Sequence, residues 1–439
     1  MQNTLYIIAA LCVLLWGMYI IQFNPKNKSL KMIIGFVTIS MLAPITDSLY
    51  VWFVELILII VMWYKSGKVI RFTECSIYIL FLLWALFTLL YSSNFYRGVK
   101  GIIMYAFPLL FYVLTVLAVR SKKDVRRLCV AFERSLIPFA ILGLFALFIG
   151  QFSTIQVYYG MSVCVIPFIF HRKKRTYQMM YIFLCALPAM LLVKRTPLLG
   201  MALALSVTSV LLYRFKALLP IIISLLVAVV VLFSIPQFRS KMFLSGEDTA
   251  LVNISHSSDL SDDLNTNGRN VFWLYLYDKF VEKNPYFGAG VGSVKSFVQS
   301  NKNEYKSSFF MVHNDWLLIL CEMGIVGVLL LLLFFIYALA KCVKYSSRSY
   351  PIVLRLVSSI TAGNLACTML HMFFENCTNS FVFPISFVFY AVLVNYVKIY
   401  ERRVKMAKII SIKNWNTDDE QKKSFGFPSN NSSIQNRFL

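Results

Sequence analysis

A histidine, an asparagine and an aspartate lie directly before a long apolar run in MVHNDWLLILCEMGIVG, residues 311–327. An imidazole gains and loses protons near neutral pH, so the side chain of His313 has the chemistry of a general base. Asn314 and Asp315 are residue types that cap the N-terminus of a helix, so a helix is expected to begin here. His313 is therefore either a solvated residue before a capped helix, or a general base or substrate ligand.

Two arginines are candidates for binding an anion. Arg195 follows an apolar run in LLVKRTPLLG, and Arg269 opens an aromatic segment in NGRNVFW. If neither arginine has a role in the activity, Arg195 snorkels from a helix end, and Arg269 is solvated or pairs with lipid phosphates. A guanidinium group recognises phosphate through two parallel hydrogen bonds. Two guanidinium groups and one imidazole on the same side of a membrane would suit a membrane-embedded diphosphate.

Glu322 places a carboxylate inside the apolar run that follows His313. Isolated charges at membrane depth are costly, so we expect a buried carboxylate with a partner in the bundle rather than a catalytic group. On a continuous helix, Glu322 would also lie about half a turn out of phase with His313. Gly324 and Gly327 follow at a spacing that predicts close packing of a neighbouring helix.

His371 lies near the end of a later apolar run, followed by Glu375 and Asn376. We interpret these three residues as a hydrogen-bonded cluster at a helix end. The alternative is that they line the same site as His313.

The composition is that of a membrane protein. Of the 439 residues, 59% are hydrophobic and 14% are charged, and the mean hydropathy is +0.69. Soluble chains are about a quarter charged. The net charge of +23 would suit nucleic acid, but the charges lie between the apolar runs, so we expect no nucleic-acid partner. The nine cysteines form no CxxC motif, and no metal site or cofactor is expected.

The apolar runs predict an all-α polytopic protein of about thirteen transmembrane helices with one large extracytoplasmic loop. The predicted spans are 5–23, 31–45, 49–64, 76–91, 99–119, 128–149, 154–170, 177–193, 196–213, 217–235, 315–340, 352–372 and 380–399. They divide the chain into four parts. These are an N-terminal bundle (1–235), the large loop (236–314), three C-terminal helices (315–400) and a cytoplasmic, disordered tail (401–439).

The basic residues predict the orientation of the spans. Twenty-one Lys and Arg residues lie in the odd-numbered connections, whereas the short even-numbered connections hold four, Arg97, Lys100, Lys194 and Arg195. Cytoplasmic connections carry the excess of basic residues, so the N-terminus is expected outside and the C-terminus in the cytoplasm. Arg97, Lys194 and Arg195 then lie on the outer face against this bias, which suggests an anionic ligand there.

The large loop contains two further motifs. Residues 270–283, NVFWLYLYDKFVEK, predict an aromatic helix along the membrane interface. It is followed by Gly288, Gly290 and Gly292 in NPYFGAGVGS. These glycines follow no strand, so we interpret them as a tight turn that lets the backbone approach another segment, and not as a nucleotide-binding loop.

The combined pattern resembles the bacterial O-antigen ligase and polymerase superfamily. The resemblance rests on Gly268-Arg269 with Trp273, on NPYFGAG at 284–290, on His313-Asn314, and on EMGIVG at 322–327. The signature covers about 269–340, and the multispan frame with Arg195 agrees with it over most of the chain. Two features depart from the family, namely thirteen spans where ligases usually have twelve and Asp315 after the His-Asn pair.

The resemblance implies a glycosyltransferase of the GT-C type in the bacterial cytoplasmic membrane, with an extracytoplasmic active site and no metal or nucleotide sugar. Its donors would be undecaprenyl-diphosphate-linked oligosaccharides. Arg195 and Arg269 would hold the diphosphate, and His313 would assist catalysis. Arg97, Lys194, Asn314, Glu322 and His371 are secondary candidates.

Three functions follow as expectations. The first is a polysaccharide polymerase for O-antigen, capsule or exopolysaccharide, which transfers a growing glycan to the next lipid-linked repeat unit. The second is a ligase that transfers lipid-linked glycan to lipid A-core, protein or a wall polymer. The third is a non-enzymatic transporter of lipid-linked sugars. Membrane lipids, a chain-length regulator and a flippase are the expected partners.

Overall fold

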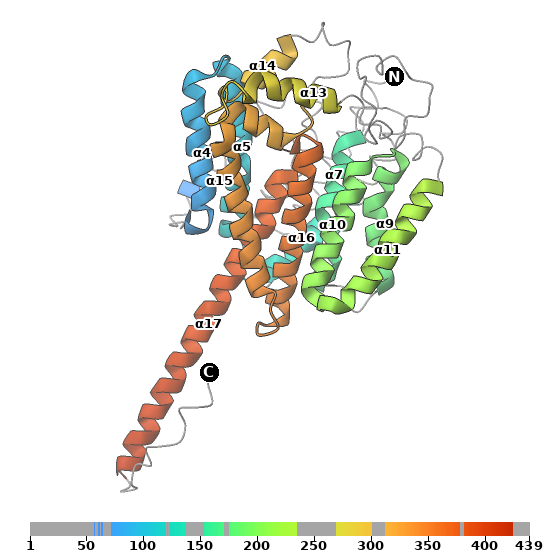
Figure 1. Ribbon diagram of the computed structural model, residues 1–439. Helices are drawn as coiled ribbons and strands as arrows, with labels where there is room; N and C mark the ends of the chain where they lie inside the picture. The colour runs from blue at the N-terminus through green and yellow to red at the C-terminus, as the bar shows by residue number, and fades with distance from the viewer. Residues whose placement is uncertain are drawn as a thin grey trace. The chain divides into compact units, whose positions relative to one another are not determined.

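The computed structural model describes residues 72–134, 153–170, 175–234, 269–300, 312–377 and 382–424, apart from 120 and 122, and a few isolated positions. Every regular element in these ranges is a helix (Figure 1). The longer helices are α4 (Ser76–Thr88), α5 (Phe95–Ala118), α7 (Ser153–Val163), α9 (Arg175–Leu191), α10 (Arg195–Tyr213), α11 (Leu218–Ser234), α15 (Asp315–Tyr345), α16 (Ile352–Phe374) and α17 (Val382–Ser424). The shorter ones are η1 (Phe72–Cys75), η2 (Leu89–Tyr91), α8 (Pro167–Phe170), η3 (Arg214–Ala217), α13 (Arg269–Leu276), the π-helical η5 (Tyr277–Val281) and α14 (Ser293–Ser300).

Several of these helices are long and apolar enough to cross a membrane, as the sequence predicts for a multi-pass protein. Six such segments occur in the described part of the chain, namely Phe72–Tyr91, Phe95–Ala118, Arg195–Ser224, Asp315–Tyr345, Ile352–Phe374 and Val382–Ala407. The predicted spans 5–23, 31–45, 49–64 and much of 128–149 lie outside the described residues, so the total of thirteen stays a prediction. The predicted span 154–170 is interrupted, because α7 ends at Val163 and α8 begins at Pro167.

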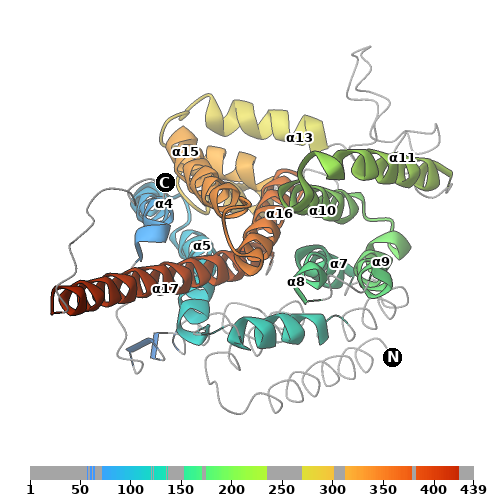
Figure 2. The same cartoon turned by 90° about the horizontal axis from the view of Figure 1, so that it is seen from below.

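Helix α16 lies between two groups of helices. Figure 2 shows α4, α5 and α15 on one side of it and α7 to α11 on the other. Its most extensive contacts are with α10 and α15, it also contacts α7 and α8, and α15 in turn packs on α4. Aromatic rings fill the space between α4, α15 and the start of α17, where the ring of Phe387 lies 4.6 Å from Tyr78 and 4.9 Å from Phe334. This packing holds the middle of α15 against α4 and the start of α17.

The described part of the large loop lies across the end of the bundle where α15 begins (Figure 1). The predicted aromatic helix is confirmed as α13 with η5. Phe272 and Leu276 of α13, Val294 and Val298 of α14, and Leu318 of α15 belong to one buried apolar cluster. The loop therefore has a core of its own that joins it to the start of α15. Residues 236–268 and 301–311 of the predicted loop lie outside the described residues.

Helix α15 breaks at Gly324, whose φ of 66° and ψ of −171° are not helical. The break frees backbone groups on both sides, and the segment 284–290 occupies it. Ala289 N and Gly290 N donate to the carbonyl oxygens of Cys321 and Glu322, each at 2.8 Å. Ile325 N donates to Pro285 O at 2.9 Å. The polar backbone groups of the broken helix are thus paired with the loop, as burial in an apolar bundle requires.

The glycines of the loop permit this close approach, as the sequence predicted. Gly288, Gly290 and Gly292 all have φ between 73° and 90°. A Cβ on Gly288 would overlap the backbone of Glu322, and a Cβ on Gly290 would lie 2.7 Å from Cα of Ser92.

The predicted role of Gly324 and Gly327 is wrong in its partner. A Cβ on Gly324 would overlap the carbonyl group of Tyr286, so the segment that packs there is the loop and not a helix. At Gly327 the nearest side chains are Met323 and Ile319 of α15 itself. The motif EMGIVG therefore breaks a helix to receive the loop.

Replacing Gly288 with Ala is expected to lower the thermal stability of the protein in detergent. The added Cβ meets the backbone of Glu322, and the left-handed conformation alone costs a non-glycine residue about 1–2 kcal/mol. Tyr286→Ala is the control, because that side chain is 66% exposed and its loss leaves the backbone path unchanged. An unfolding midpoint for Gly288→Ala equal to that of Tyr286→Ala would contradict the inserted-loop arrangement.

Residues 394–439 form a second compact unit, separate from residues 1–393. Within it α17 continues to Ser424. The predicted disorder of the tail 401–439 is therefore wrong for residues 401–424, which are helical. Residues 425–439 lie outside the described residues.

Candidate active site

The backbone around His313 is fixed on both sides. His313 has φ of 51°, a left-handed conformation that few non-glycine residues adopt. Before it, the carbonyl oxygen of Val312 accepts a hydrogen bond of 2.7 Å from Trp273 Nε1. After it, Asn314 caps α15 by accepting a hydrogen bond of 3.0 Å from Leu317 N. The imidazole is thus presented from a short, strained segment between α13 and α15.

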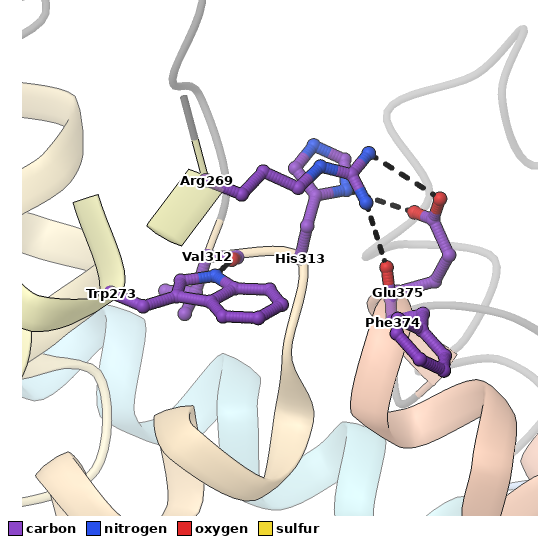
Figure 3. A network of polar contacts seen from close by, with 6 residues as sticks. All are labelled: Arg269, Trp273, Val312, His313, Phe374 and Glu375. Atoms are coloured by element: carbon purple, nitrogen blue, oxygen red, sulfur yellow. Dashed lines mark hydrogen bonds and ion pairs between the residues drawn. The ribbon is translucent and has the colours of Figure 1, made fainter. Parts of the chain in front are cut away.

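Glu375 holds the ring of His313 from the opposite side. It is the residue directly after α16, and its backbone N–H bonds to His371 O at 2.9 Å. Its Oε2 lies 2.9 Å from Nδ1 of His313 (Figure 3). The second ring nitrogen, Nε2, does not take part in this contact. A neutral imidazole that donates from Nδ1 carries its lone pair on Nε2, so Nε2 would be the basic atom.

Arg269 joins the same carboxylate. Its Nη2 lies 3.5 Å from Oε1 of Glu375, and its Nη1 donates a hydrogen bond of 2.9 Å to the carbonyl oxygen of Phe374 (Figure 3). The guanidinium group therefore caps the last turn of α16, where the helix dipole favours a cation. Five N–H groups are present on a guanidinium, and these two contacts use few of them. The others remain suited to a further anion.

Arg195 is the third predicted residue and begins α10. Two residues before it, Val193 has φ of 51°, an unusual conformation for a β-branched residue. The positive charges of Arg195 and Arg269 act on each other. Two neighbouring cations repel, and an anion between them relieves that repulsion. The structure therefore joins Arg269 and His313 through Glu375, and the charge of Arg195 acts on that of Arg269.

The cluster of Arg269, His313 and Glu375 is partly exposed, and the Glu375 carboxyl group is ionised. The side chains of Arg269, His313 and Glu375 are 27%, 30% and 17% exposed, so a ligand can reach them. Burial alone raises the pKa of the Glu375 carboxyl. The hydrogen bond with His313 and the charge of Arg269 outweigh that effect and hold this pKa below its ordinary value. Glu375 is thus a carboxylate at neutral pH.

His371 lies one helical turn before Glu375 on α16. It is 1% exposed, and its ring packs against Tyr158 of α7 with centroids 4.4 Å apart. Neither ring nitrogen has a hydrogen-bond partner among the described residues. The predicted alternative for this cluster is therefore correct for Glu375, which joins His313, whereas His371 lies beneath it in the bundle.

The other secondary candidates have different surroundings. Arg97 donates a hydrogen bond of 2.8 Å to the carbonyl oxygen of Lys295, so it attaches α14 to the start of α5. Lys194 is the residue before α10, and its backbone N–H bonds to Ala189 O at 2.9 Å. The side chain of Asn314 caps α15 and is 5% exposed. These contacts of the three residues hold the helices and the loop in place.

Glu322 is a buried carboxylate with partners, as predicted, but the partners come from the loop. Its Oε1 accepts hydrogen bonds from Val294 N at 3.2 Å and Lys295 N at 3.4 Å, at the N-terminus of α14. We expected Glu322 to lie half a turn out of phase with His313 on one continuous helix. That helix does not include His313, because α15 begins at Asp315. Glu322 is nonetheless absent from the His313 cluster because its carboxylate caps α14.

Glu322→Gln is expected to retain most of the activity, whereas Glu322→Ala is expected to lose stability. The amide oxygen of Gln can accept the same two backbone hydrogen bonds. Ala leaves two buried donors without a partner, at about 1–3 kcal/mol for each such group. The measurement is the unfolding midpoint and the glycan product of both variants in membranes. An inactive but equally stable Glu322→Gln would give Glu322 a catalytic role.

No group of three or more His, Cys, Asp or Glu residues suited to a metal ion occurs among the described residues. The eight cysteines in that part of the chain are buried. The cluster offers cations, an imidazole and a single carboxylate, which is chemistry for binding an anion and moving a proton.

A family comparison connects this geometry to known proteins. Residues 180–332 match the family model described as O-antigen ligase. The match confirms the resemblance to the O-antigen ligase and polymerase superfamily. It covers about a third of the chain and includes Arg195, Arg269, His313 and the loop–helix insertion. It ends before Glu375. A search of curated proteins found no match.

Proposed function

We propose that this chain is a polysaccharide polymerase of the GT-C type. It would transfer a growing glycan from undecaprenyl diphosphate to the next lipid-linked repeat unit, at the outer face of the bacterial cytoplasmic membrane. The family match suggests a glycosyltransferase-like membrane enzyme. The observation that carries the proposal is that Glu375 joins Arg269 and His313 at one end of an apolar helical bundle, where the charge of Arg195 acts on that of Arg269.

The reaction has a simple balance in this proposal. The hydroxyl oxygen of the acceptor sugar attacks the anomeric carbon of the donor and forms the glycosidic bond. The bond from that carbon to the diphosphate oxygen breaks, and its electron pair leaves with the polyprenyl diphosphate. The proton of the hydroxyl goes to Nε2 of His313. No oxidant, metal or nucleotide is needed for this balance.

Each part of the cluster has a physical reason for its role. Negative charge develops on the departing diphosphate, and guanidinium groups fixed beside it stabilise that charge. Arg195 and Arg269 suit this role because their positive charges act on each other, and an anion bound by both would offset the repulsion. A base that accepts the hydroxyl proton typically contributes about 10²–10⁴-fold in rate. An apolar bundle that holds both polyprenyl chains makes the reaction effectively intramolecular.

A chain-length analysis tests the polymerase assignment. Cells that lack the gene should retain glycans of one repeat unit on the final acceptor and lose long chains. The wild-type gene should restore the ladder, and the His313→Ala gene should not. Loss of all attached glycan would instead support the ligase function.

Ligation is the second candidate, because the matched family is described as O-antigen ligase. A ligase would transfer lipid-linked glycan to lipid A-core, protein or a wall polymer. It needs the same activated donor, the same two arginines and the same base, so the cluster suits either acceptor. Transport of lipid-linked sugar forms no bond and would leave the imidazole of His313 without a proton to accept.

The remaining features of the proposal concern location and partners. The N-terminus would lie outside and the C-terminus in the cytoplasm, in accordance with the distribution of basic residues. The reaction needs lipid-linked repeat units on the outer face, so a flippase is the expected supplier. A chain-length regulator is the expected partner of a polymerase.

A further inference from the structure

We propose that Glu375 is a positioning residue that acts through His313, so that Nε2 of the ring faces the acceptor. The inference rests on the proposed transferase function and adds a residue to its machinery. Glu375 lies outside the segment 180–332 that matches the family model. It is distant from His313 in the sequence, and folding brings the two side chains into contact.

The two oxygens of Glu375 have different partners. Oε2 contacts Nδ1 of His313 at 2.9 Å, and Oε1 contacts Nη2 of Arg269 at 3.5 Å. Glu375 therefore lies between the base and Arg269, and Arg269 is also held by its own hydrogen bond to Phe374 O. Within the described part of the chain, the ion pairs of Arg269 and His313 both involve Glu375.

The contact with His313 determines which nitrogen is basic. A carboxylate that accepts a proton from Nδ1 favours the ring form whose lone pair is on Nε2. The strained backbone of His313, with φ of 51°, fixes the start of the side chain but leaves its rotation open. Glu375 fixes that rotation from the opposite side.

The charge of Glu375 also suits the reaction. When Nε2 takes the acceptor proton, the ring becomes a cation directly beside the carboxylate, which stabilises it. Arg269 and His313 keep that carboxylate ionised, and His371 and Tyr158 are the other titratable groups that act on it. The ring of His313 is the group that changes charge in the proposed step.

The carboxylate itself is held rigidly. Glu375 follows the last residue of α16, and its N–H bonds to His371 O, one turn earlier. Arg269 bonds to Phe374 O at the same helix end. The position of Glu375 therefore depends on α16 and α13 and does not depend on His313. A variant that lacks the imidazole should keep the carboxylate in place.

A double-mutant cycle with Glu375→Gln and His313→Ala tests the inference on the purified full-length chain. Glu375→Gln alone should lower kcat by about 10²-fold, within the range that a positioned base contributes, while KM for the lipid-linked donor stays near the wild-type value. In the His313→Ala background the same Gln substitution should change kcat by less than about twofold, because coupled residues are not additive. Glu375→Asp, which keeps the charge, should recover part of the lost kcat.

Glu282→Gln is the matched control, because Glu282 is an exposed carboxylate at the end of η5, and its kcat should equal the wild type. Each variant is compared by its unfolding midpoint in detergent. If wild type forms no glycosidic bond, the proposed function fails and the inference fails with it. If wild type is active, wild-type kcat in Glu375→Gln overturns the inference alone. Losses that multiply in the double variant also overturn it, because Glu375 would then act independently of His313.

Discussion

His313→Ala lowers the rate of glycan transfer by about 10²–10⁴-fold in our account, the range that proton transfer to a positioned base contributes. The protein level in the membrane and the unfolding midpoint should stay close to the wild type. His313 is 30% exposed in its side chain, so its removal leaves no large cavity. The measurement is kcat on lipid-linked repeat units with the purified chain.

The control for this prediction is His313→Asn. Asparagine adopts the left-handed conformation of residue 313 more readily than alanine and carries no basic nitrogen. Both variants should therefore lose activity to a similar extent. If Asn restored the rate, the backbone conformation rather than the imidazole would be the property that matters, and His313 would not be the base.

Arg195→Ala and Arg269→Ala have the second large effect, and Lys should not replace either residue. Each guanidinium is expected to bind the diphosphate of the donor, so both KM for the donor and kcat should worsen. A lysine keeps the charge but cannot make two parallel hydrogen bonds to phosphate. Loss of one charge-assisted contact of this kind costs about 1.5–3 kcal/mol, which is roughly 10- to 150-fold in kcat/KM.

The two arginines should differ in stability. Arg269 also caps α16 through Phe374 O and pairs with Glu375, so Arg269→Ala should lower the unfolding midpoint as well as the activity. Arg195→Ala should affect mainly the activity. Arg348→Ala is the control, because Arg348 is exposed in the turn after α15. Normal kcat/KM in both arginine variants would remove the diphosphate site from the account.

The sequence predicted local features correctly where one segment determines them. A histidine and an asparagine before an apolar run identify a residue beside a capped helix, and Asn314 does cap α15. Arg269 begins α13 and Arg195 begins α10, as their positions before apolar or aromatic runs suggested. The left-handed glycines were recognisable because few other residues adopt such conformations.

Contacts between distant segments were not recognisable in the same way. Glu375 follows His313 by 62 residues, and the sequence offered their shared site only as an alternative, because no local pattern shows that the end of α16 lies beside the start of α15. The sequence analysis missed the break at Gly324 for the same reason. Gly324 and Gly327 have the spacing of a helix-packing motif, but the partner of Gly324 is the backbone of Tyr286. Arg97 was predicted to bind an anion because it lies on the outer face against the charge bias. Its hydrogen bond to the Lys295 carbonyl group forms only in the folded loop, so the sequence could not show it.

The central claim is that this chain by itself forms a glycosidic bond at the expense of the bond to a lipid diphosphate. The most direct measurement incubates the purified full-length protein in detergent with polyprenyl-diphosphate-linked repeat units, without nucleotide sugar and with a chelator. We predict longer lipid-linked glycans and one free polyprenyl diphosphate for each bond formed. Unchanged donor and acceptor, or free polyprenyl diphosphate without a longer glycan, would contradict the account.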